Sequence, residues 1–507
     1  RGASSPNENP FMAIMRKDAV EDFGEVYGFS LVYSGNFKML LEAETYGTMR
    51  FQAGVNPHNF KWKLNKGEQF ITPELVMVYS KNGLGEMSRT FHRLYRRNLC
   101  RGIWRDKVRP ILINNWEATY FDFNEDKLIN ICKKASELGI ELFVLDDGWF
   151  GKRNNDKSSL GDWFVNTDKL PGSLKGLSEK VDKLGMSFGL WVEPEMISED
   201  SDLFRKHPDW ALRIQGREMH EGRNQYVLDM GRDDVVAYLT DVFTAVLGSA
   251  DIKYIKWDMN RNISDANSAA LPPNRQGEVM HRYILGVYKL MENLVSTFPN
   301  ILFEGCSGGA GRNDPGILYY MPQNWGSDNT DAVERMYIQY GAGMVYPSST
   351  ICAHVSDVPN HQVGRTTPMK LRSEVAMSAV MGYEFDLSKL TDDECYDISE
   401  QIKQYKRIRS IVCFGDLYRL INPFENRSAS WMYVSEDKTK AVVFYYNKLA
   451  KPNSEIRRLK LKGLDEGKTY IVDNKEYTGR TLMNFGLYLP EYEKDFESRA
   501  WEIEEKK

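Results

Sequence analysis

The sequence of 507 residues is poor in the residues and motifs that mark several classes of protein. Its six cysteines are scattered, and no two have CxxC spacing, so neither a zinc site nor a disulfide framework is predicted. Scattered, unpaired cysteines favour a reducing compartment. The seven histidines form no HExxH motif, and no metal site is expected. A serine nucleophile is also disfavoured, because none of the histidines forms a triad-like cluster.

Two further features are missing: an excess of basic charge and a long apolar run. The formal net charge is -5, which argues against a nucleic-acid partner, because such proteins carry a basic face. No run approaches the roughly 20 apolar residues that cross a membrane, so no membrane association is expected. No secretory signal is visible either, which favours a cytoplasmic protein. The chain begins with Arg1 rather than Met, so this expectation leaves open a leader ahead of it.

What the sequence does contain is an ordinary globular composition rich in aromatic residues. Charged residues make up 27% and aromatic residues 12%, including 11 Trp. The length predicts about three domains at roughly 150 residues each. Several Trp lie beside carboxylates, a combination that suits a sugar pocket, because a flat ring packs on the pyranose while carboxylates accept from its hydroxyls.

The hydrophobic pattern divides the chain into three regions. Residues 11–80 are β-like, with GFSLVYSG, MRFQAGV and FITPELVMVYS as strand candidates. Residues 105–410 alternate short apolar strands with amphipathic helices, which predicts βα units and a parallel sheet. From residue 414 strands return, including SWMYVSED and AVVFYYNK, so a C-terminal antiparallel β-sandwich is expected.

The middle region offers enough strands for an α/β fold with a closed (β/α)8 barrel. The eight candidates are ILINNWE, LFVLDDGW, SFGLWVEPE, YVLDM, YIKWDMN, ILFEGCSGG, QNWGSD and MVYPSS. Helices are expected between them, for example over Glu125–Leu138, Asp233–Leu247 and Glu278–Thr297. Asn124 is the predicted N-cap of the first of these helices.

Polar residues follow the ends of these candidate strands. Because barrel enzymes keep their active sites at the carboxyl ends of the strands, we expect these side chains to meet at one mouth. They are Trp116, Asp146, Asp147, Trp191, Asp258, Cys306 and Asp328.

Two of these acids could do chemistry together. Asp258 and Asp328 end the fifth and seventh candidate strands, and two facing carboxyls are the minimum machinery for glycoside hydrolysis. The alternative for each residue is a helix cap or a surface acid. Lys256 lies two residues before Asp258 and therefore on the same strand face, where its charge would keep Asp258 ionised.

Three other stretches allow two interpretations each. Asp146 and Asp147 either accept from sugar hydroxyls or cap a loop. The glycine-rich CSGGAGR at 306–312 lacks the phosphate-loop pattern, so it either lets a substrate approach the backbone or forms a flexible turn. His354 and His361 flank VSDVPN, which is predicted to be a loop.

Together these motifs resemble the α-galactosidases of glycoside hydrolase family 36. The resemblance runs in order from Phe91 to Ala332, through WEATYFDF, LDDGWFGKRNND, LGDWFVN, GLWVEPEM, KWDMNR, EGCSGG and NWGSDNTDA. It implies a catalytic TIM barrel over residues 91–412 and a C-terminal β-sandwich over 413–507. Residues 1–90 would be the remnant of an N-terminal β-sandwich and a linker.

The resemblance also implies roles for individual residues. Asp258 would be the nucleophile and Asp328 the acid/base of a retaining hydrolase that needs no cofactor. The sugar-binding positions would be Trp116, Asp146, Asp147, Trp191, Arg223, Lys256, Cys306 and Gly309. The substrates would be galactoside oligosaccharides with terminal α-1,6-linked galactose, such as melibiose and raffinose. The alternatives are an α-N-acetylgalactosaminidase and a catalytically silent sugar-binding protein.

The N-terminal region departs from the family, whose sandwich is much larger than the roughly 90 residues present, a length short of a typical domain. Relatives in the family are often tetramers in which this sandwich borders a neighbour's active site. We therefore expect the natural chain to begin earlier, with an extra segment of roughly 150–250 residues, and to form a homo-oligomer.

Overall fold

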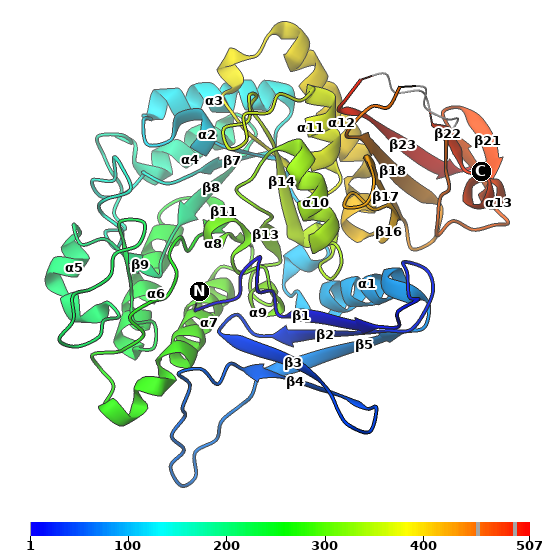
Figure 1. Cartoon of the computed structure of the whole chain (residues 1–507). Coiled ribbons are helices and arrows are strands. Elements are labelled where there is room, and N and C mark those ends of the chain that lie inside the picture. The colour runs from blue at the N-terminus through cyan, green and yellow to red at the C-terminus, as the bar shows by residue number, and fades with distance from the viewer. Residues whose placement is uncertain (1, 453–456, 490–493, 507) are drawn as a thin grey trace.

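A computed structural model describes residues 2–452, 457–489 and 494–506. An α/β barrel occupies the centre, the N-terminal strands lie beneath it, and the C-terminal sheets lie to one side (Figure 1). Within the described ranges, no helix combines the length and the apolar character needed to cross a membrane.

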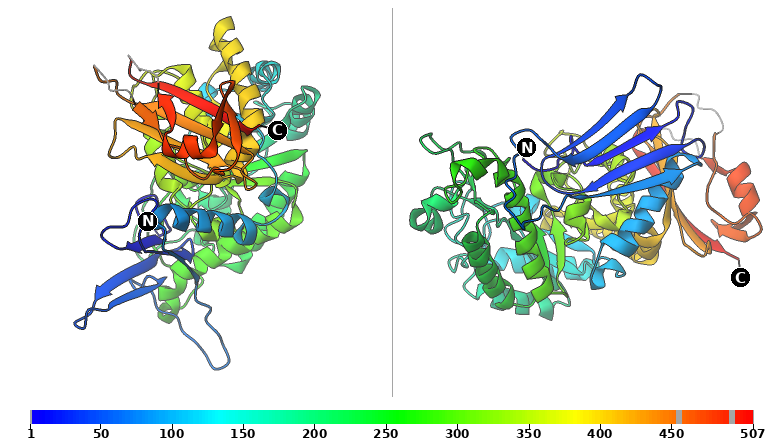
Figure 2. Two further views of the ribbon diagram at one scale, coloured as in Figure 1. Left: turned by 90° about the vertical axis from the view of Figure 1, so that its right-hand side faces the viewer. Right: turned by 90° about the horizontal axis from the view of Figure 1, so that it is seen from below.

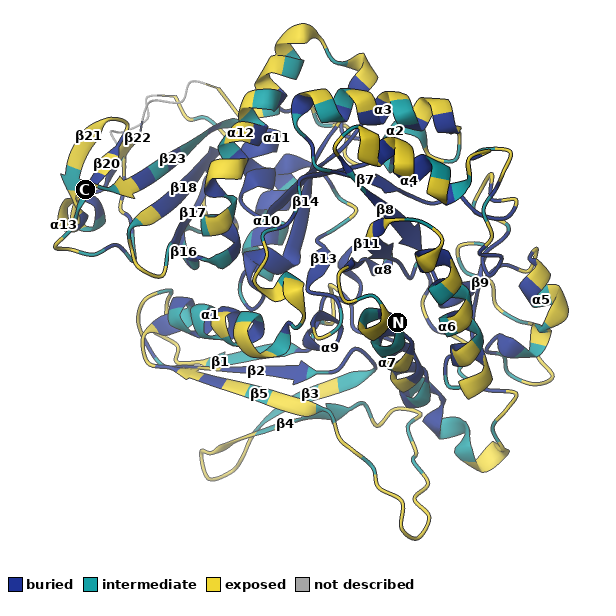
Figure 3. Ribbon diagram, turned by 180° about the vertical axis from the view of Figure 1, so that it is seen from behind, coloured by how far each residue is buried: buried dark blue, intermediate teal, exposed yellow. Residues whose placement is uncertain are grey.

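Eight parallel strands close the barrel and confirm the predicted fold class. In chain order they are β6 (Leu112–Asn114), β7 (Leu142–Leu145), β8 (Ser187–Val192), β11 (Ile252–Trp257), β12 (Leu302–Gly305), β13 (Gln323–Trp325), β14 (Ile351–Ser356) and β15 (Val380–Glu384). The residues of the eight strands are almost all buried, because helices cover the barrel. The exposed residues of these helices lie mainly on their outer faces (Figure 3).

Two of the eight strand predictions are wrong. In YVLDM, only β10 (Tyr226–Val227) is a strand, and it pairs antiparallel with β9 (Met196–Ile197) outside the barrel. MVYPSS ends in a 3₁₀ turn just before β14, and the last strand, β15, was missed. Asp258 therefore follows the fourth barrel strand and Asp328 the sixth, rather than the fifth and seventh.

The predicted helices agree with the structure to within about a residue at each end. The helices are α1 (Gly83–Leu94), α2 (Trp116–Thr119), α3 (Glu125–Leu138), α4 (Ser173–Lys183), α5 (Asp202–Lys206), α6 (Asp233–Gly248), α7 (Val279–Thr297), α8 (Ser307–Ala310), α9 (Pro315–Leu318), α10 (Ala332–Ala342), α11 (Met369–Met377), α12 (Asp392–Phe414) and α13 (Gly479–Asn484). The cap at Asn124 is confirmed, because its side chain accepts a 3.0 Å hydrogen bond from the amide of Lys127.

Short helical turns complete the connections. They are a π-turn at Tyr95–Leu99 and 3₁₀ turns at Ile103–Arg105, Pro208–Trp210, Pro273–Glu278, Ser348–Thr350 and Leu387–Lys389.

The N-terminal region forms two small antiparallel sheets. One has the order β1-β2-β5 and the other pairs β3 with β4. Their strands are β1 (Phe11–Met15), β2 (Val26–Val32), β3 (Phe37–Ala43), β4 (Met49–Val55) and β5 (Glu74–Ser80). Phe29 stacks on Phe51 with ring centroids 3.9 Å apart and joins the two sheets. Helix α1 packs on β2 and β5 and lies between this region and the C-terminal sheet (Figure 2).

The C-terminal region is a sandwich of a large and a small antiparallel sheet. The large sheet has the order β16-β17-β18-β23-β20-β21, and the small one pairs β19 with β22. The strands are β16 (Asp416–Ile421), β17 (Ser428–Val434), β18 (Lys440–Asn447), β19 (Arg457–Leu459), β20 (Thr469–Val472), β21 (Lys475–Thr478), β22 (Leu487–Leu489) and β23 (Glu497–Glu505). Leu459 and Leu487 of the small sheet share one buried cluster with Met432, Tyr470 and Trp501 of the large sheet.

One buried arginine joins all three regions. Arg419 of β16 donates to the carboxylate of Glu21 at 3.1 Å, to the Gly343 carbonyl at 3.1 Å and to the Ser88 hydroxyl at 2.8 Å. Its side chain is only 2% exposed. A buried guanidinium with this many partners fixes the relative position of the regions that it contacts.

We predict that Arg419→Met lowers the free energy of unfolding by roughly 2–4 kcal/mol, because Glu21 and the acceptors of Gly343 and Ser88 lose their donor. Arg407→Met is the matched control, since Arg407 forms a largely exposed pair with Glu502 and should contribute less than about 1 kcal/mol. Thermal unfolding of both variants measures the difference. Equal losses of stability would show that Arg419 is not a joint between regions.

Candidate active site

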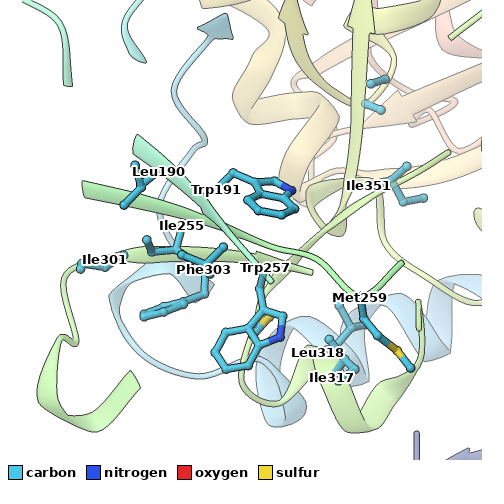
Figure 4. Close-up of a cluster of buried hydrophobic side chains, with 14 of the residues drawn as sticks. Leu190, Trp191, Ile255, Trp257, Met259, Ile301, Phe303, Ile317, Leu318 and Ile351 are labelled. Atoms are coloured by element: carbon cyan, nitrogen blue, oxygen red, sulfur yellow. The ribbon is translucent and has the colours of Figure 1, made fainter. Parts of the chain in front are cut away.

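Strand alternation decides which side chains of β11 point into the barrel. Tyr254 belongs to the buried cluster inside the barrel, whereas Ile255 and Trp257 pack with Phe303 in the layer between strands and helices (Figure 4). Because successive side chains of a strand point to opposite faces, Lys256 shares the inward face with Tyr254, and Asp258 continues it just past the strand.

A cavity of about 220 Å³ opens at the carboxyl ends of the barrel strands. Nine of the ten residues predicted for the site line it: Trp116, Asp146, Asp147, Trp191, Arg223, Lys256, Asp258, Cys306 and Asp328. The tenth, Gly309, packs behind Asp328, where an added Cβ would lie 2.7 Å from the Asp328 amide nitrogen. The structure thus brings nine of the ten predicted residues together at the cavity and places Gly309 directly behind one of them.

A buried ion pair lies at the centre of the cavity. The Lys256 Nζ donates to Asp146 Oδ2 at 2.9 Å, and Asn114 Nδ2 donates to the same oxygen at 2.6 Å. Burial lowers the pKa of Lys256, but the surrounding acids, Asp146 first, outweigh burial and hold this pKa well above its usual value. Lys256 therefore stays charged inside the barrel.

Asp258 is surrounded by hydrogen-bond donors. They are the amides of Met259 and Gly308, Asn260 Nδ2 and Trp191 Nε1, at 2.8, 2.9, 2.7 and 3.2 Å. Burial raises the pKa of Asp258, but the charge of Lys256 and these donors outweigh it and bring the pKa below its ordinary value. The carboxylate is therefore ionised, as a nucleophile requires.

Asp328 has the opposite electrostatics. Its Oδ1 accepts one hydrogen bond, from Trp325 Nε1 at 2.9 Å. Burial raises the pKa of Asp328, and the negative charge of Asp258 raises it further. One carboxyl of the cavity thus favours the ionised form and the other holds a proton more readily, which is how acid and base roles are divided between two acids.

The glycine-rich loop after β12 serves these two acids directly. Ser307, Gly308, Gly309 and Ala310 all have positive φ, between 62° and 78°. This left-handed turn aims the Gly308 amide at Asp258 and lets Gly309 pass close to Asp328. The loop is therefore an ordered support for both acids.

A buried glutamate behind the cavity holds this loop. Glu195 accepts two hydrogen bonds from Arg312, at 2.6 and 2.9 Å, one from Trp257 Nε1 at 3.0 Å and one from the Tyr283 hydroxyl at 2.5 Å. It thereby connects the loop after β8 to the end of β11, to α7 and to the loop after β12. Trp257 directly precedes Asp258 in the chain, and Arg312 follows the loop whose Gly308 amide donates to Asp258.

Asp147 finds its partner within the protein. Arg153 donates to both of its oxygens, at 2.8 and 2.9 Å. Burial raises the pKa of Asp147, and Arg153 offsets part of that effect. The sequence interpretation, in which a ligand supplies the donors for Asp146 and Asp147, is therefore incomplete, because Lys256 and Arg153 already pair with these acids.

Several cavity residues escaped the sequence interpretation. Glu384, at the end of the missed strand β15, faces the cavity and pairs with His354 Nδ1 at 2.9 Å. His354 lies in β14, which also includes the first two residues of VSDVPN, so the predicted loop begins at Asp357. His361 lines the cavity, with its Nδ1 3.3 Å from Glu117 Oε1. Burial and the charge of Glu384 raise the pKa of Glu117 to about 9.

Glu193 also lines the cavity, although no role was predicted for it within its motif, GLWVEPEM. The strand-end pattern could have identified Glu193 and Glu384, since each lies within a residue of a barrel strand's carboxyl end. Among the described residues, no group of three or more His, Cys, Asp or Glu side chains is arranged to hold a metal ion.

Comparison with known families identifies the chain. Residues 69–415 match the family described as melibiase, and residues 1–65 and 428–503 match the N-terminal and C-terminal domains of glycosyl hydrolase family 36. The chain belongs to glycosyl hydrolase family 36. The family resemblance read from the sequence motifs is thus confirmed.

Two bacterial α-galactosidases are similar to this protein over almost the whole chain. The α-galactosidase AgaA of Geobacillus stearothermophilus is 56% identical over 504 residues, covering 99% of this chain and 69% of its own. The α-galactosidase Mel36A of Lactobacillus acidophilus is 49% identical over 503 residues, with the same coverage. The crystal structure of the Geobacillus enzyme superposes with a TM-score of 0.99 and covers 100% of this chain and 70% of that chain.

We predict that Glu195→Gln lowers the free energy of unfolding by roughly 3–5 kcal/mol, because it leaves the buried guanidinium of Arg312 without its counter-charge. Glu199→Gln is the matched control, since Glu199 follows in the same segment and is exposed. Thermal unfolding monitored by circular dichroism measures both variants. A Glu195 variant as stable as the Glu199 control would contradict the supporting role of Glu195.

Proposed function

We propose that the protein is a retaining α-galactosidase that removes terminal non-reducing α-linked galactose from oligosaccharides, with α-1,6 linkages as the preferred class. The observation that carries the proposal is the pair of carboxyls in one cavity, of which that of Asp258 accepts four hydrogen bonds and that of Asp328 one among the described residues. The relatives support the substrate class, since variants of the Geobacillus enzyme have been crystallised with raffinose and with stachyose.

The two acids divide the proposed reaction between them. The ionised Asp258 attacks the anomeric carbon while Asp328 protonates the leaving glycosidic oxygen, which gives a galactosyl–Asp258 ester. Asp328, now ionised, then removes a proton from the attacking water, and hydrolysis of the ester releases galactose. Nucleophile, acid and base all come from these two carboxyls, so the proposed chemistry needs no cofactor.

The remaining predicted residues would bind the sugar. Asp146, Asp147 and Lys256 offer charged acceptors and a donor to its hydroxyls, and Trp116, Trp191 and Arg223 line the same cavity. Cys306 is buried and Gly309 lies against Asp328, so we assign them to the neighbourhood of the sugar's 2-position. This tight wall favours a hydroxyl there over an N-acetyl group and hence a galactosidase over an α-N-acetylgalactosaminidase.

We also propose that residues 91–412 form the catalytic domain, that residues 1–90 and 413–507 flank it, and that the protein is cytoplasmic. All six cysteines are free thiols, which is typical of a reducing compartment. A homo-oligomer, namely a tetramer, is proposed as well. The exposed apolar side chains of Leu75, Met77 and Tyr79 on β5 support association with another surface.

We predict that Asp258→Ala lowers kcat by more than about a thousandfold on every α-galactoside, because the nucleophile is lost. Asp328→Ala should slow raffinose hydrolysis by roughly 10²–10⁴-fold. Its effect on formation of the intermediate from a nitrophenyl galactoside should be far smaller, because nitrophenolate leaves without a proton. Burst-phase and steady-state kinetics measure the two effects.

Asp251→Ala is the matched control for both variants, because Asp251 is an exposed acid at the opposite end of β11. It should retain the rates of the unmodified protein on both substrates. Equal losses in the rate of intermediate formation from raffinose and from the nitrophenyl galactoside in the Asp328 variant would contradict the acid role of Asp328.

A further inference from the structure

Glu193 is a buried carboxyl on the cavity wall with an unused oxygen. It follows β8 by one residue, and its side chain is 0% exposed although it lines the cavity. Glu193 Oε1 accepts a hydrogen bond from the Asn260 amide at 2.5 Å. Glu193 Oε2 has no hydrogen-bond partner among the described residues. A buried polar atom without a hydrogen-bond partner destabilises the folded protein, so a partner for this oxygen is expected.

The charges that face Glu193 are mostly negative. They are Asp258 after β11, and Asp147 and Arg153 after β7. The hydroxyl of Tyr283 on α7 also faces Glu193 and is neutral, because burial raises the pKa of Tyr283. Arg153 is the one cation among these groups, and it donates its hydrogen bonds to Asp147 and to the Ser158 carbonyl. Glu193 therefore lies beside two acids without an ion-pair partner of its own.

This environment favours the protonated carboxyl. Burial first, and the charge of Asp258 second, raise the pKa of Glu193 to about 8. Because Oε1 accepts from a backbone amide, the proton belongs on Oε2. At neutral pH, Glu193 thus carries an unpartnered O–H donor in the cavity wall. It lies beside Asp258, whose carboxylate already accepts four hydrogen bonds.

We propose that Glu193 is a further substrate-binding residue, whose protonated carboxyl donates a hydrogen bond from Oε2 to an oxygen of the bound galactosyl group. The inference rests on the proposed function, because it takes galactose as the ligand. It differs from the role of Asp146 and Asp147, which are acceptors for sugar hydroxyls. Ionised Glu193 would lose the donor and add a negative charge beside Asp258.

Equilibrium binding of galactose between pH 6 and pH 9.5 tests this role, with titration calorimetry as the readout. Binding is chosen over rate because the rate also depends on the protonation of Asp328. If only protonated Glu193 binds, the affinity of the unmodified protein should be roughly tenfold weaker at pH 9 than at pH 7. Glu193→Gln, whose amide donates without titrating, should bind within about threefold of the unmodified protein at pH 7 and keep that affinity at pH 9.

Two further variants make the result specific. Glu117→Gln removes the other raised carboxyl of the cavity and should keep the pH dependence of the unmodified protein. Glu193→Met, of similar volume but without a donor, should bind galactose about tenfold more weakly than Glu193→Gln at pH 7.

A galactose affinity that is flat with pH in the unmodified protein would overturn the role of Glu193, whatever the variants do. So would a pH dependence that survives in Glu193→Gln and disappears in Glu117→Gln, or equal affinities of the Gln and Met variants. Failure of the proposed function is distinct, because the unmodified protein would then bind no galactose at any pH and release no nitrophenol from its α-galactoside.

Discussion

The ammonium of Lys256 is the charge on which the cavity depends. Burial alone would raise the pKa of every carboxyl around Lys256 and favour the protonated form of each. Lys256 pairs with Asp146 and lowers the pKa of both Asp258 and Asp328. Two things separate these acids: the charge of Asp258 raises the pKa of Asp328, and their carboxyls have different numbers of donors. Among the described residues, four hydrogen bonds reach the carboxylate of Asp258 and one reaches that of Asp328. The Lys256 cation and an unequal distribution of donors thus favour one ionised carboxyl and one that holds its proton more readily.

The fold provides this arrangement through alternation and support from behind. Parallel strands bring Lys256 and Asp258 to the inward face and send Trp257 outward, where it donates to Glu195. Glu195 also accepts hydrogen bonds from Arg312, which follows the left-handed turn in the chain. This contact helps to hold the turn, whose Gly308 amide donates to Asp258. The side chains that touch the cavity therefore depend on a second, fully buried set behind them.

The sequence made the barrel and most of the cavity predictable, because strand ends carry polar residues and the motifs are dense. It misled at YVLDM, a short apolar run that resembles a barrel strand but forms a two-residue antiparallel pair. It concealed β15, whose residues are all buried and show no alternation. The partners of buried charges could not be predicted, since Arg153 with Asp147, and Glu195 with Arg312, meet only in the folded barrel. Glu193 was visible in its motif, but its proton depends on burial beside Asp258, which sequence spacing does not reveal.

The central claim is that Asp258 is an ionised nucleophile that forms a covalent galactosyl ester. Two successive displacements at the anomeric carbon return the original configuration, whereas direct attack by water inverts it. Proton NMR of the first product released from a nitrophenyl α-galactoside, recorded before mutarotation, tests this claim most directly. The account predicts α-galactose as the first anomer, followed by slow equilibration with the β form. β-Galactose as the first product would contradict it.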